Sequence, residues 1–289
     1  MNHSPFLSLI IPCHNALPYL STCVESLKKQ GFQNWELIVI DNGSTDGLKE
    51  WIRNQSFSFP FLFSRNEINP GYAAGVNQGA ANCRGEIIVV LNSDLTFESV
   101  FLENIVLGFR NTGLEMAALH VKNKEGTKTE SLGVYLTSFL RGKNSTTGSD
   151  ILGPSGTAFA LKKNLLKKIS TPNGLLYDER YFFLWEDIEL SCRLSKLGIA
   201  TGVIENAVCF HHGNSSRSGY FYKQYLSLRN RFYLIRTYYP AYRRTHWMAM
   251  VFYDLPRLLF FLLFNPYRLR WIKEELLNKK LFIETMEDT

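Results

Sequence analysis

The chain has 289 residues, of which 45% are hydrophobic and 20% charged, and its formal net charge is +6. This length and composition favour a globular protein with one large domain, or one domain and an appendage. The five cysteines are odd in number and never spaced Cys-x-x-Cys, which argues against a disulfide framework or a thiolate zinc site. We therefore expect a reducing, cytoplasmic compartment. The first twelve residues lack the basic region of a signal peptide, so no export is expected.

The positive charge is concentrated at one end of the chain. Residues 1–220 contain 20 Lys or Arg and 20 Asp or Glu, whereas residues 221–289 contain 12 and 6, so the whole excess lies in the second range. This division predicts a neutral body over 1–220 and a basic, aromatic-rich tail over 221–289. Such a tail favours an anionic surface as its partner, and a membrane or a nucleic acid would both match.

The first part of the chain alternates between strand and helix patterns. Apolar runs at 7–12, 36–40 and 86–91 have strand length, and residues 19–30 and 71–83 have helical patterns. Strand, helix, strand is the opening of a parallel α/β sheet. Because these strands are apolar throughout, we expect helices on both faces of the sheet.

The middle of the chain is less regular. Residues 122–150 are rich in Gly, Ser, Thr, Asn and Lys and predict loops around one short apolar stretch at 134–140. A helix is expected from residue 186, with Leu190, Leu194 and Leu197 on one face and an end at Gly198.

The tail contains one long apolar stretch, Trp247–Phe264, which approaches the length that spans a membrane. Asp254, Pro256 and Arg257 near its middle make spanning costly, so the sequence predicts a pair of helices lying in the plane of a membrane interface. The alternative is that these residues pack back onto the body, since basic aromatic surfaces also occur at protein interfaces.

Three predicted strands end in polar clusters that should meet at one edge of the sheet, where open parallel sheets bind ligands. The clusters are Pro12-Cys13-His14-Asn15, Asp41 to Asp46, and Asn92-Ser93-Asp94. Each alone is ordinary turn chemistry, but together they predict a binding site. The glycine series from 69 to 79 lacks the spacing of a dinucleotide motif. It favours close backbone approach to a ligand, tight helix packing, or both.

Two further groups can carry chemistry. Glu186 and Asp187 open a helix after the aromatic stretch YFFLW, either as caps that complement the helix dipole or as a semi-buried site for a base. His211 and His212 are followed by Gly, Asn and Ser in a loop, which is typical of a metal or phosphate contact.

Taken in order, these segments resemble the family 2 glycosyltransferases of the GT-A fold, especially the bacterial rhamnosyltransferase-like group that builds O-antigens and other surface polysaccharides. The resemblance rests on SLIIPCHNALPYLSTCVESL, WELIVIDNGSTDG, NPGYAAGVNQG, VVLNSD, LLYDERYFFLWEDIELSCRLSKLG and CFHHGNSS, within residues 7–217. It implies an α/β fold, a Rossmann-like mixed sheet flanked by helices, with a C-terminal helical appendage.

The resemblance also implies where the donor binds. The nucleotide and donor-sugar pocket would comprise Pro12, His14, Asn15, Asp41, Asn69, Gly71, Asn77, Ser93 and Asp94. Within it, Asp41 would accept hydrogen bonds from the base. Asp94 matches the last acid of the D-x-D motif that binds Mg²⁺ or Mn²⁺, and Asn92 replaces the first acid. His211 would complete the metal or diphosphate site, with His212 as the competing candidate.

On the acceptor side, Asp187 matches the catalytic base, Glu186 its neighbour, and Gly156 and Trp185 would lie beside them. The implied activity is inverting transfer of a sugar from a nucleotide-diphosphate donor to a glycan or polyprenyl-linked glycan. The implied location is peripheral, at the inner face of the cell membrane, where the tail would bind anionic lipid and nucleic acid would not be a partner. A nucleotidyltransferase and a non-catalytic scaffold are the alternatives. Against a nucleotidyltransferase, the sequence has no basic, glycine-rich loop near its N-terminus. Against a scaffold, Asp41, Asp94 and Asp187 are all present, although a non-catalytic protein would not require them.

Overall fold

The computed structural model describes residues 5–213 and 219–274. The chain divides into two compact units. The first comprises residues 1–137 and 142–217, and the second comprises residues 138–141 and 218–289. The boundary at residue 220 expected from charge stays a prediction.

The first unit contains all the described strands: β1 (Leu7–Cys13), β2 (Trp35–Asp41), β3 (Phe61–Arg65), β4 (Ile87–Leu91), β5 (Leu95–Phe97), β6 (Met116–Asn123), β7 (Thr129–Ser131), β8 (Val134–Leu136), β9 (Gly142–Asn144), β10 (Ala158–Lys162) and β11 (Gly202–His211). Its helices are α1 (Leu17–Leu27), α2 (Leu48–Arg53), α3 (Tyr72–Asn82), α4 (Phe101–Thr112), η1 (Lys163–Leu165), α5 (Leu166–Ile169), η2 (Glu179–Tyr181) and α6 (Glu186–Lys196).

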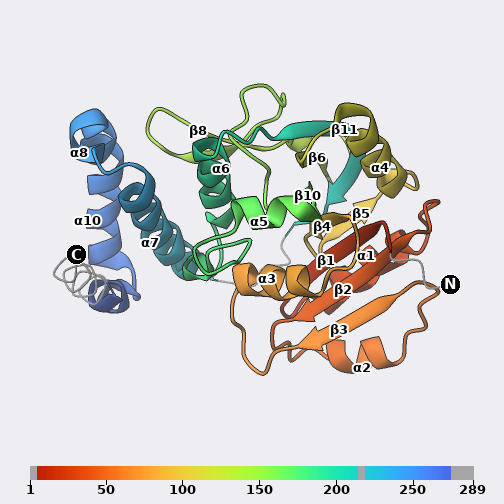
Figure 1. The fold of residues 1–289 in the computed structure, drawn as a ribbon. Helices are drawn as coiled ribbons and strands as arrows, with labels where there is room; N and C mark the ends of the chain where they lie inside the picture. Colours follow the sequence, from red (N-terminus) through yellow and green to blue (C-terminus); the bar gives the residue numbers. More distant parts are fainter. Residues whose placement is uncertain (1–4, 214–218, 275–289) are drawn as a thin grey trace. The chain divides into compact units, whose positions relative to one another are not determined.

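One mixed sheet organises this unit, with the order β3-β2-β1-β4-β10-β6-β11-β5 and β7 added beside β6 (Figure 1). The strands β3, β2, β1 and β4 are parallel, whereas β10 runs antiparallel to both β4 and β6. The predicted fold class, a mixed α/β sheet flanked by helices, is confirmed.

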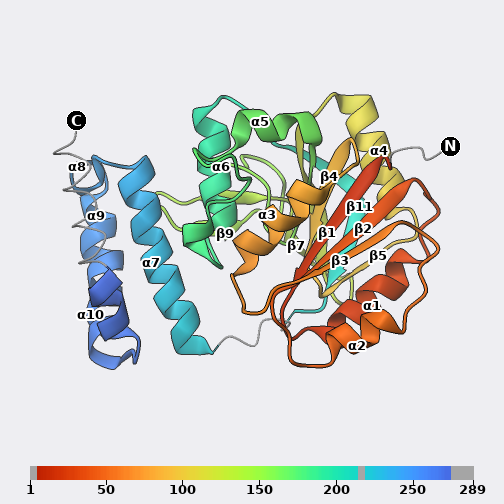
Figure 2. The ribbon, with the colours of Figure 1, turned by 60° about the horizontal axis from the view of Figure 1, so that its bottom comes forward.

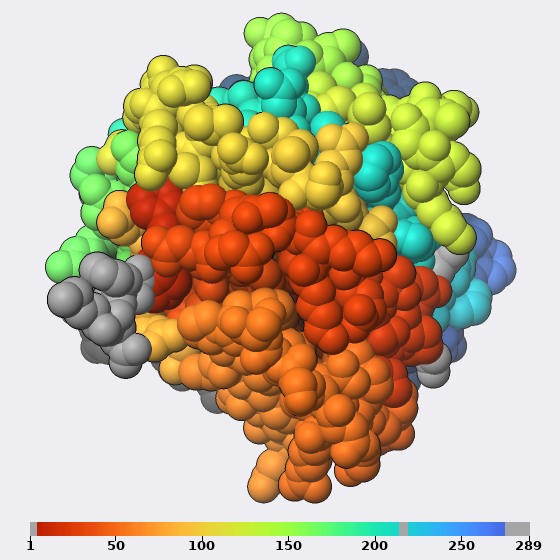
Figure 3. All heavy atoms as spheres, turned by 90° about the vertical axis from the view of Figure 1, so that its right-hand side faces the viewer, coloured from red at the N-terminus to blue at the C-terminus, as the bar shows by residue number. Residues whose placement is uncertain are grey.

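The two faces of the sheet have separate cores because successive side chains of a strand point to opposite faces. Alternate residues of β1, β2 and β4 join α1, α2 and α4 in one core, and the residues between them join α3, α5 and α6 in the other (Figure 2). Figure 3 views the first of these layers, where residues of α1 (red) lie beside those of α4 (yellow). The strands are buried on both faces, as their unbroken apolar runs predict.

The structure differs from the sequence expectations in two places. Residues 122–150, predicted as loops, contain the three-residue strands β7, β8 and β9, which are too short to give a periodic pattern. Leu197 was predicted to share a face with Leu190 and Leu194, but it follows the last turn of α6 and is 51% exposed, whereas the other two are fully buried.

The second unit is helical, with α7 (Tyr220–Tyr238), α8 (Tyr242–Thr245), α9 (Trp247–Ala249), η3 (Met250–Asp254) and α10 (Leu255–Phe264). The prediction of two helices within 247–264 is wrong, because the run is continuous and η3 is a π-helical turn. Pro256 explains the turn. Its ring clashes with the carbonyl four residues earlier in a regular helix, and widening the preceding turn relieves the clash.

A buried ion pair lies inside the second unit. Arg231 on α7 has no exposed surface, and its Nε donates to Oδ1 of Asp254 at 2.6 Å. The hydroxyl of Tyr242 donates to Oδ2 of the same carboxylate, and the Arg231 guanidinium also donates to the carbonyls of Phe139 and Leu140. The charge that makes Asp254 unfavourable in an apolar stretch is thus compensated within the unit.

We expect Asp254→Ala to destabilise the helical unit by about 3–5 kcal/mol, because the buried Arg231 would lose the carboxylate that its Nε pairs with. Urea denaturation followed by circular dichroism would measure the loss, and amide hydrogen exchange in α7 would locate it. The double variant Arg231→Met/Asp254→Leu removes both charges and should lose less than Asp254→Ala. A double variant that is less stable than the single one would contradict this account.

Candidate functional site

The first polar cluster lies at the carboxyl ends of β1 and β2, with Asp41 at its centre. The Asp41 side chain is fully buried. Its Oδ1 accepts the Ser44 N–H at 2.8 Å, and its Oδ2 accepts from the Arg65 guanidinium. A nucleotide base could therefore reach this carboxylate only if Arg65 or Ser44 moved. The role of Asp41 as acceptor of the base stays a prediction, and its observed role is to hold Arg65 at the end of β3.

His14 and Asn15 join the ends of the same two strands. Nδ1 of His14 lies 2.7 Å from the Asn42 carbonyl oxygen, and Oδ1 of Asn15 accepts the Thr45 N–H at 2.7 Å. The Asn15 N–H donates to the Ser44 hydroxyl. His14 and Thr45 are exposed, whereas Pro12 and Cys13 before His14 are buried. The imidazole of His14 is thus one part of this cluster that a ligand can reach.

The glycine series forms the start of α3, and Gly71 is required there. Its φ is +99°, and a Cβ at this position would lie 2.5 Å from the ring of Phe182. Asn69 accepts the Gly71 N–H at 2.9 Å. Asn77 is 5% exposed and bonds both the N–H and the carbonyl of Tyr177. Asn77 therefore fixes the segment that leads to α6, and the structure shows no surface for a donor sugar at its amide.

Asp94 and His211 lie together, as their predicted shared role requires. β5 follows Asp94 directly and pairs with β11 so that His211 is opposite Leu95. The His211 Nε2 is 3.4 Å from Oδ2 of Asp94, and its Nδ1 is 2.8 Å from Oε2 of Glu130. His212 instead places its Nε2 3.2 Å from the Thr96 hydroxyl. Of the two candidate histidines, only His211 contacts the Asp94 side chain among the described bonds.

The electrostatics of His211 follow from these contacts. Burial lowers the pKa of the imidazole, but the hydrogen bonds and negative charges of Asp94 and Glu130 outweigh it and raise the pKa to about 9. A positive imidazolium thus sits between two carboxylates.

The oxygen and nitrogen atoms of this cluster fit a divalent cation such as Mg²⁺ or Mn²⁺. Asp94 and Ser93 are almost fully buried at the end of β4. The Oδ1 atom of Asn92 is buried and makes no hydrogen bond within the described residues. Across residues 5–213 and 219–274, however, no group of three or more His, Cys, Asp or Glu side chains is placed to hold a metal. A cation here would need ligands beyond the described His, Cys, Asp and Glu side chains.

The acidic pair at the start of α6 follows a strained turn. Phe182, Leu184 and Trp185 all have positive φ, at 60°, 69° and 73°. Each such conformation of a non-glycine residue costs about 1–3 kcal/mol in conformational energy. These conformations persist where the surrounding packing enforces them, and they cluster at functional sites. Here the Phe182 carbonyl accepts the Ala73 N–H, so the turn is held on the start of α3. The strain fixes where α6 begins and where its first carboxylates point.

Glu186 and Asp187 have no cation opposite them in the described ion pairs. Glu186 is 6% exposed, and its Oε2 makes no hydrogen bond there. Burial, and then the charge of Asp187, raise the pKa of Glu186 to about 8. Loss of hydration also raises the pKa of Asp187, against the lowering effect of hydrogen bonds from the Gly156 and Ile188 N–H groups. At neutral pH the pair therefore keeps a proton on Glu186, which leaves Asp187 as the member that can be ionised.

Tyr72 lies within range of the charges of both acidic clusters. Its hydroxyl donates to the Gly156 carbonyl at 2.7 Å, and the Gly156 N–H donates to Oδ2 of Asp187 at 3.0 Å. Burial raises the pKa of Tyr72 well above its usual range, and the charges of Glu186, Asp187 and Asp94 raise it further. Gly156 thus lies against the base candidate, where a Cβ would be 3.5 Å from its Oδ2. Trp185, the other predicted acceptor-side residue, is the last residue before α6 and is partly exposed.

The sequence did not single out Glu130, Tyr72 or Arg65. Glu130 lies in the segment predicted as loops and meets His211 across 81 residues, so no local signal could have found it. Tyr72 stands within the glycine series, but its link to Gly156 depends on the insertion of β10 beside β4. Arg65 ends a strand whose pairing with β2 was not predicted.

Residues 8–170, more than half of the chain, match the family described as Glycosyl transferase family 2. The chain belongs to glycosyltransferase family 2. It is similar to the glycosyltransferase YfnE of Bacillus subtilis, with 38% identity over 89 residues that make up 30% of this chain and 23% of YfnE. The chain spans less than half the length of the curated relatives that it matches first.

Solved structures share the fold of this family 2 chain. The mannosyltransferase PcManGT from Pyrobaculum calidifontis, in complex with GDP-Man and Mn²⁺, covers 97% of the chain and 76% of its own length with a TM-score of 0.58 and 16% identity. S. aureus TarS 1–349, in complex with UDP-GlcNAc, covers 81% and 67% with a TM-score of 0.57 and 18% identity. The fold is therefore the GT-A fold, as expected.

Glu186→Gln should change how the stability of this family 2 protein depends on pH. The pKa of Glu186 is about 8 in the folded protein against an ordinary value of 4.5, so the folded state retains a proton that the unfolded chain releases. The stability contributed by this group is complete below pH 4.5 and is lost as the pH rises through 8. Glutamine does not titrate, so the variant should gain stability relative to the wild type across this window.

Urea denaturation at several pH values would measure the effect, with a difference on the order of a few kcal/mol between the ends of the window. Glu103→Gln, at an exposed position of α4, is the matched control and should leave the pH dependence unchanged. Parallel stability curves for Glu186→Gln and the wild type would show that Glu186 does not titrate in this range.

Proposed function

We propose that the chain is an inverting, metal-dependent glycosyltransferase. It moves a sugar from a nucleotide-diphosphate donor to a hydroxyl of a glycan or polyprenyl-linked glycan. The observation that carries the proposal is the pair Glu186 and Asp187, which has no cation opposite it in the described ion pairs. Asp187 accepts from Gly156, and the next residue, Thr157, accepts the Asn92 N–H at the edge where Asp94 and His211 lie. Membership of family 2 supports transfer of a glycosyl group.

The donor would lie along the ends of β1, β2 and β4. TarS and PcManGT, which share the fold, are solved with UDP-GlcNAc and GDP-Man, so a nucleotide sugar is the class of donor that we propose. His14 is an exposed polar side chain of the first cluster, and Arg65 is held in place by Asp41. These side chains are available to meet the base or the phosphates.

Asp94 would hold Mg²⁺ or Mn²⁺ together with His211, which must release its ring proton to become a ligand, and Asn92 would be a further oxygen donor. The cation, when bound, supplies positive charge that stabilises the diphosphate as it leaves. Because the described residues offer few ligands, the donor's own diphosphate would complete the coordination. Affinity for the metal without nucleotide should therefore be weak.

Asp187 would act as the general base. Its Oδ2 is held by the Gly156 N–H, and the proton on Glu186 lets Asp187 carry the negative charge of the pair. Asp187 takes the proton of the acceptor hydroxyl while that oxygen forms a bond to the anomeric carbon. The bond from that carbon to the diphosphate oxygen breaks, and its electron pair leaves with the nucleoside diphosphate. A single displacement of this kind inverts the anomeric centre.

The finer assignment is a rhamnosyltransferase-like role in O-antigen or capsule synthesis. It rests on the segments quoted from the sequence, and YfnE and TarS do not decide it. A nucleotidyltransferase is the alternative enzyme, and a product that contains a new phosphate ester instead of a glycosidic bond would identify it.

Asp187→Asn should lower turnover by about a thousandfold or more, since it removes the base while keeping the shape of the side chain. Binding of the nucleotide sugar, measured by calorimetry, should remain within a few-fold of the wild type. Asp178→Asn, which changes a carboxylate that pairs with Arg180 outside this pair, is the control. Normal turnover of Asp187→Asn would overturn the assignment of the base.

Asp94→Ala should abolish the stabilisation that Mn²⁺ and nucleotide sugar give together, because it removes the buried carboxylate of the proposed metal site. Thermal unfolding with UDP-, dTDP- and GDP-sugars would measure it and would identify the donor nucleotide. His211→Gln should raise the Mn²⁺ concentration required, and His212→Gln should do so much less. An equal effect of the two histidine variants would contradict the geometry at Asp94.

A further inference from the structure

The helical run 247–264 in the second unit has one buried and one exposed side. Ala249, Asp254 and Phe261 are buried within the unit. Large apolar side chains cover the other side: Trp247, Met248, Val251, Phe252, Leu255, Leu259, Phe260, Leu263 and Phe264. Their spacing of three and four residues places them in one stripe along the helix, which we call the apolar stripe. Only 17% of the run is buried, and a continuous exposed stripe of this size marks a site of association.

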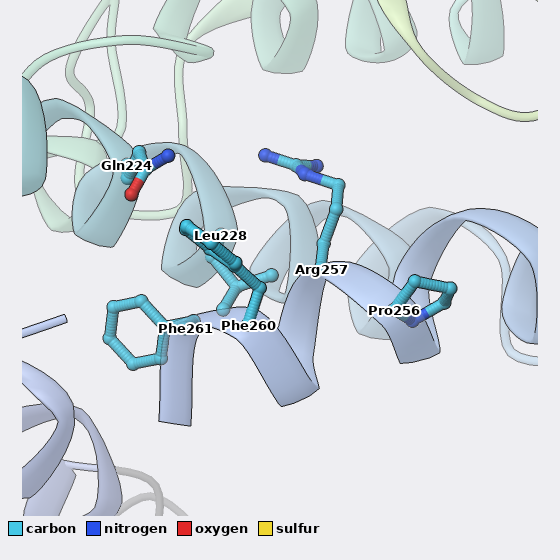
Figure 4. Close-up of a pocket in the computed structure, with 6 residues that line it drawn as sticks. All are labelled: Gln224, Leu228, Pro256, Arg257, Phe260 and Phe261. Carbon is cyan, nitrogen blue, oxygen red and sulfur yellow. The ribbon is translucent and has the colours of Figure 1, made fainter. Parts of the chain in front are cut away.

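A cleft adjoins the stripe between α7 and α10. It has a volume of about 240 Å³ and is lined by Gln224, Leu228, Pro256, Arg257, Phe260 and Phe261, which Figure 4 shows. Most of this lining is apolar. The Oε1 of Gln224 is buried and makes no hydrogen bond within the described residues. The cleft is thus suited to an apolar chain with a polar group near Arg257.

Arg257 gives the cleft its charge. Its guanidinium donates to the Tyr253 hydroxyl at 3.0 Å and lies 4.8 Å from the centre of that ring. Within residues 5–213 and 219–274 it forms no ion pair with a carboxylate. Arg243 and Arg244 just before the run are exposed and likewise form no ion pair with a described residue. Unneutralised arginines beside an apolar stripe favour a partner that is apolar and anionic.

Lipid at a membrane interface has both properties. Apolar side chains enter the acyl region, and arginines pair with phosphates at the surface. A second copy of this chain would match the stripe but would bring the same arginines face to face. Charge complementarity therefore favours an anionic bilayer over self-association.

The run satisfies the length and hydropathy of a membrane-spanning helix, but its buried side argues against spanning. Asp254 is paired with Arg231 and Tyr242 inside the unit. Pulling the run out of the unit into lipid would break this pair and place charges in hydrocarbon, which is unfavourable. A helix that keeps one side on its own unit can lie in one leaflet instead.

We propose that the apolar stripe docks in the plane of one leaflet of an anionic bilayer, with Arg257 paired to a lipid phosphate at the mouth of the cleft. This surface goes beyond the proposed transfer and does not depend on it. It would bring a polyprenyl-linked acceptor and the protein to the same plane, which raises their local concentration.

Sedimentation of the full chain with vesicles tests the proposal. The protein should bind vesicles of phosphatidylglycerol and phosphatidylcholine more tightly than vesicles of phosphatidylcholine alone. Leu259→Glu/Leu263→Glu, at positions 52% and 68% exposed, should weaken binding to the anionic vesicles by at least about tenfold. Val100→Glu/Leu107→Glu, at 44% and 43% exposed in the first unit, adds the same charge elsewhere and should weaken binding much less than Leu259→Glu/Leu263→Glu at the same salt concentration.

The role of Arg257 has its own control. Arg257→Gln should reduce binding to anionic vesicles several-fold, whereas Arg53→Gln removes the same charge from the exposed end of α2 and should have a smaller effect. Brominated acyl chains should quench the fluorescence of Trp247, and Trp247→Phe should lose that quenching. Equal effects of the two arginine variants would show that only net charge matters.

Two outcomes would overturn the proposal. One is undiminished vesicle binding by Leu259→Glu/Leu263→Glu with normal circular dichroism. The other is a wild-type dimer in light scattering that this variant converts to a monomer, which would assign the stripe to a second copy. Turnover on a soluble acceptor is measured separately and should not change in this variant, so failure of the docking proposal and failure of the transfer proposal remain distinguishable.

Discussion

In both units of this molecule, the pairing of buried carboxylates with cations is the constraint on which the rest of the structure depends. Arginine neutralises four of the buried acids, in the pairs Glu36–Arg84, Asp41–Arg65, Glu189–Arg193 and Asp254–Arg231. Three of these pairs join different elements of the fold, whereas Glu189–Arg193 lies within α6. Glu186 is the exception, because the described residues give it no ion pair and burial keeps it protonated. The fold thus concentrates acidity without a paired cation at the start of α6, where the proposed transfer needs a base.

The direction of β10 determines how the carboxylates at the start of α6 come close to the polar end of β4. β10 enters antiparallel between β4 and β6, so the residues before it reach the edge where β4 ends. Thr157 accepts the Asn92 N–H, and Gly156 next to it bonds Tyr72 and Asp187. Two residues of backbone therefore connect the polar end of β4 with the acidic pair. A wholly parallel sheet would place this segment at the opposite edge.

The sequence predicts the parts of this arrangement that local patterns determine. Unbroken apolar runs identified β1, β2 and β4, and the polar residues that follow them identified Asp41 and Asp94 as members of one edge. What depends on contacts across the chain could not be predicted, such as Glu130 beside His211 and Arg65 on Asp41. The burial of Asp41 and Asn77 could not be predicted either, because it depends on residues from other parts of the chain that cover them. The tail shows the limit most clearly. Asp254 and Pro256 predicted an interruption of the helix, but Arg231 neutralises Asp254 and a π-helical turn accommodates Pro256, so the helix continues.

The composition of the second unit has a consequence for the order in which the protein folds. Residues 138–141 belong with it although some 80 residues separate them from α7, and their carbonyls accept from the buried guanidinium of Arg231. During synthesis these carbonyls leave the ribosome long before α7 does, and they have no guanidinium to bond until it follows. The last helices therefore complete a polar core that the middle of the chain begins. A fragment starting after residue 220 would lack those acceptors and would leave the buried guanidinium of Arg231 with fewer hydrogen-bond partners.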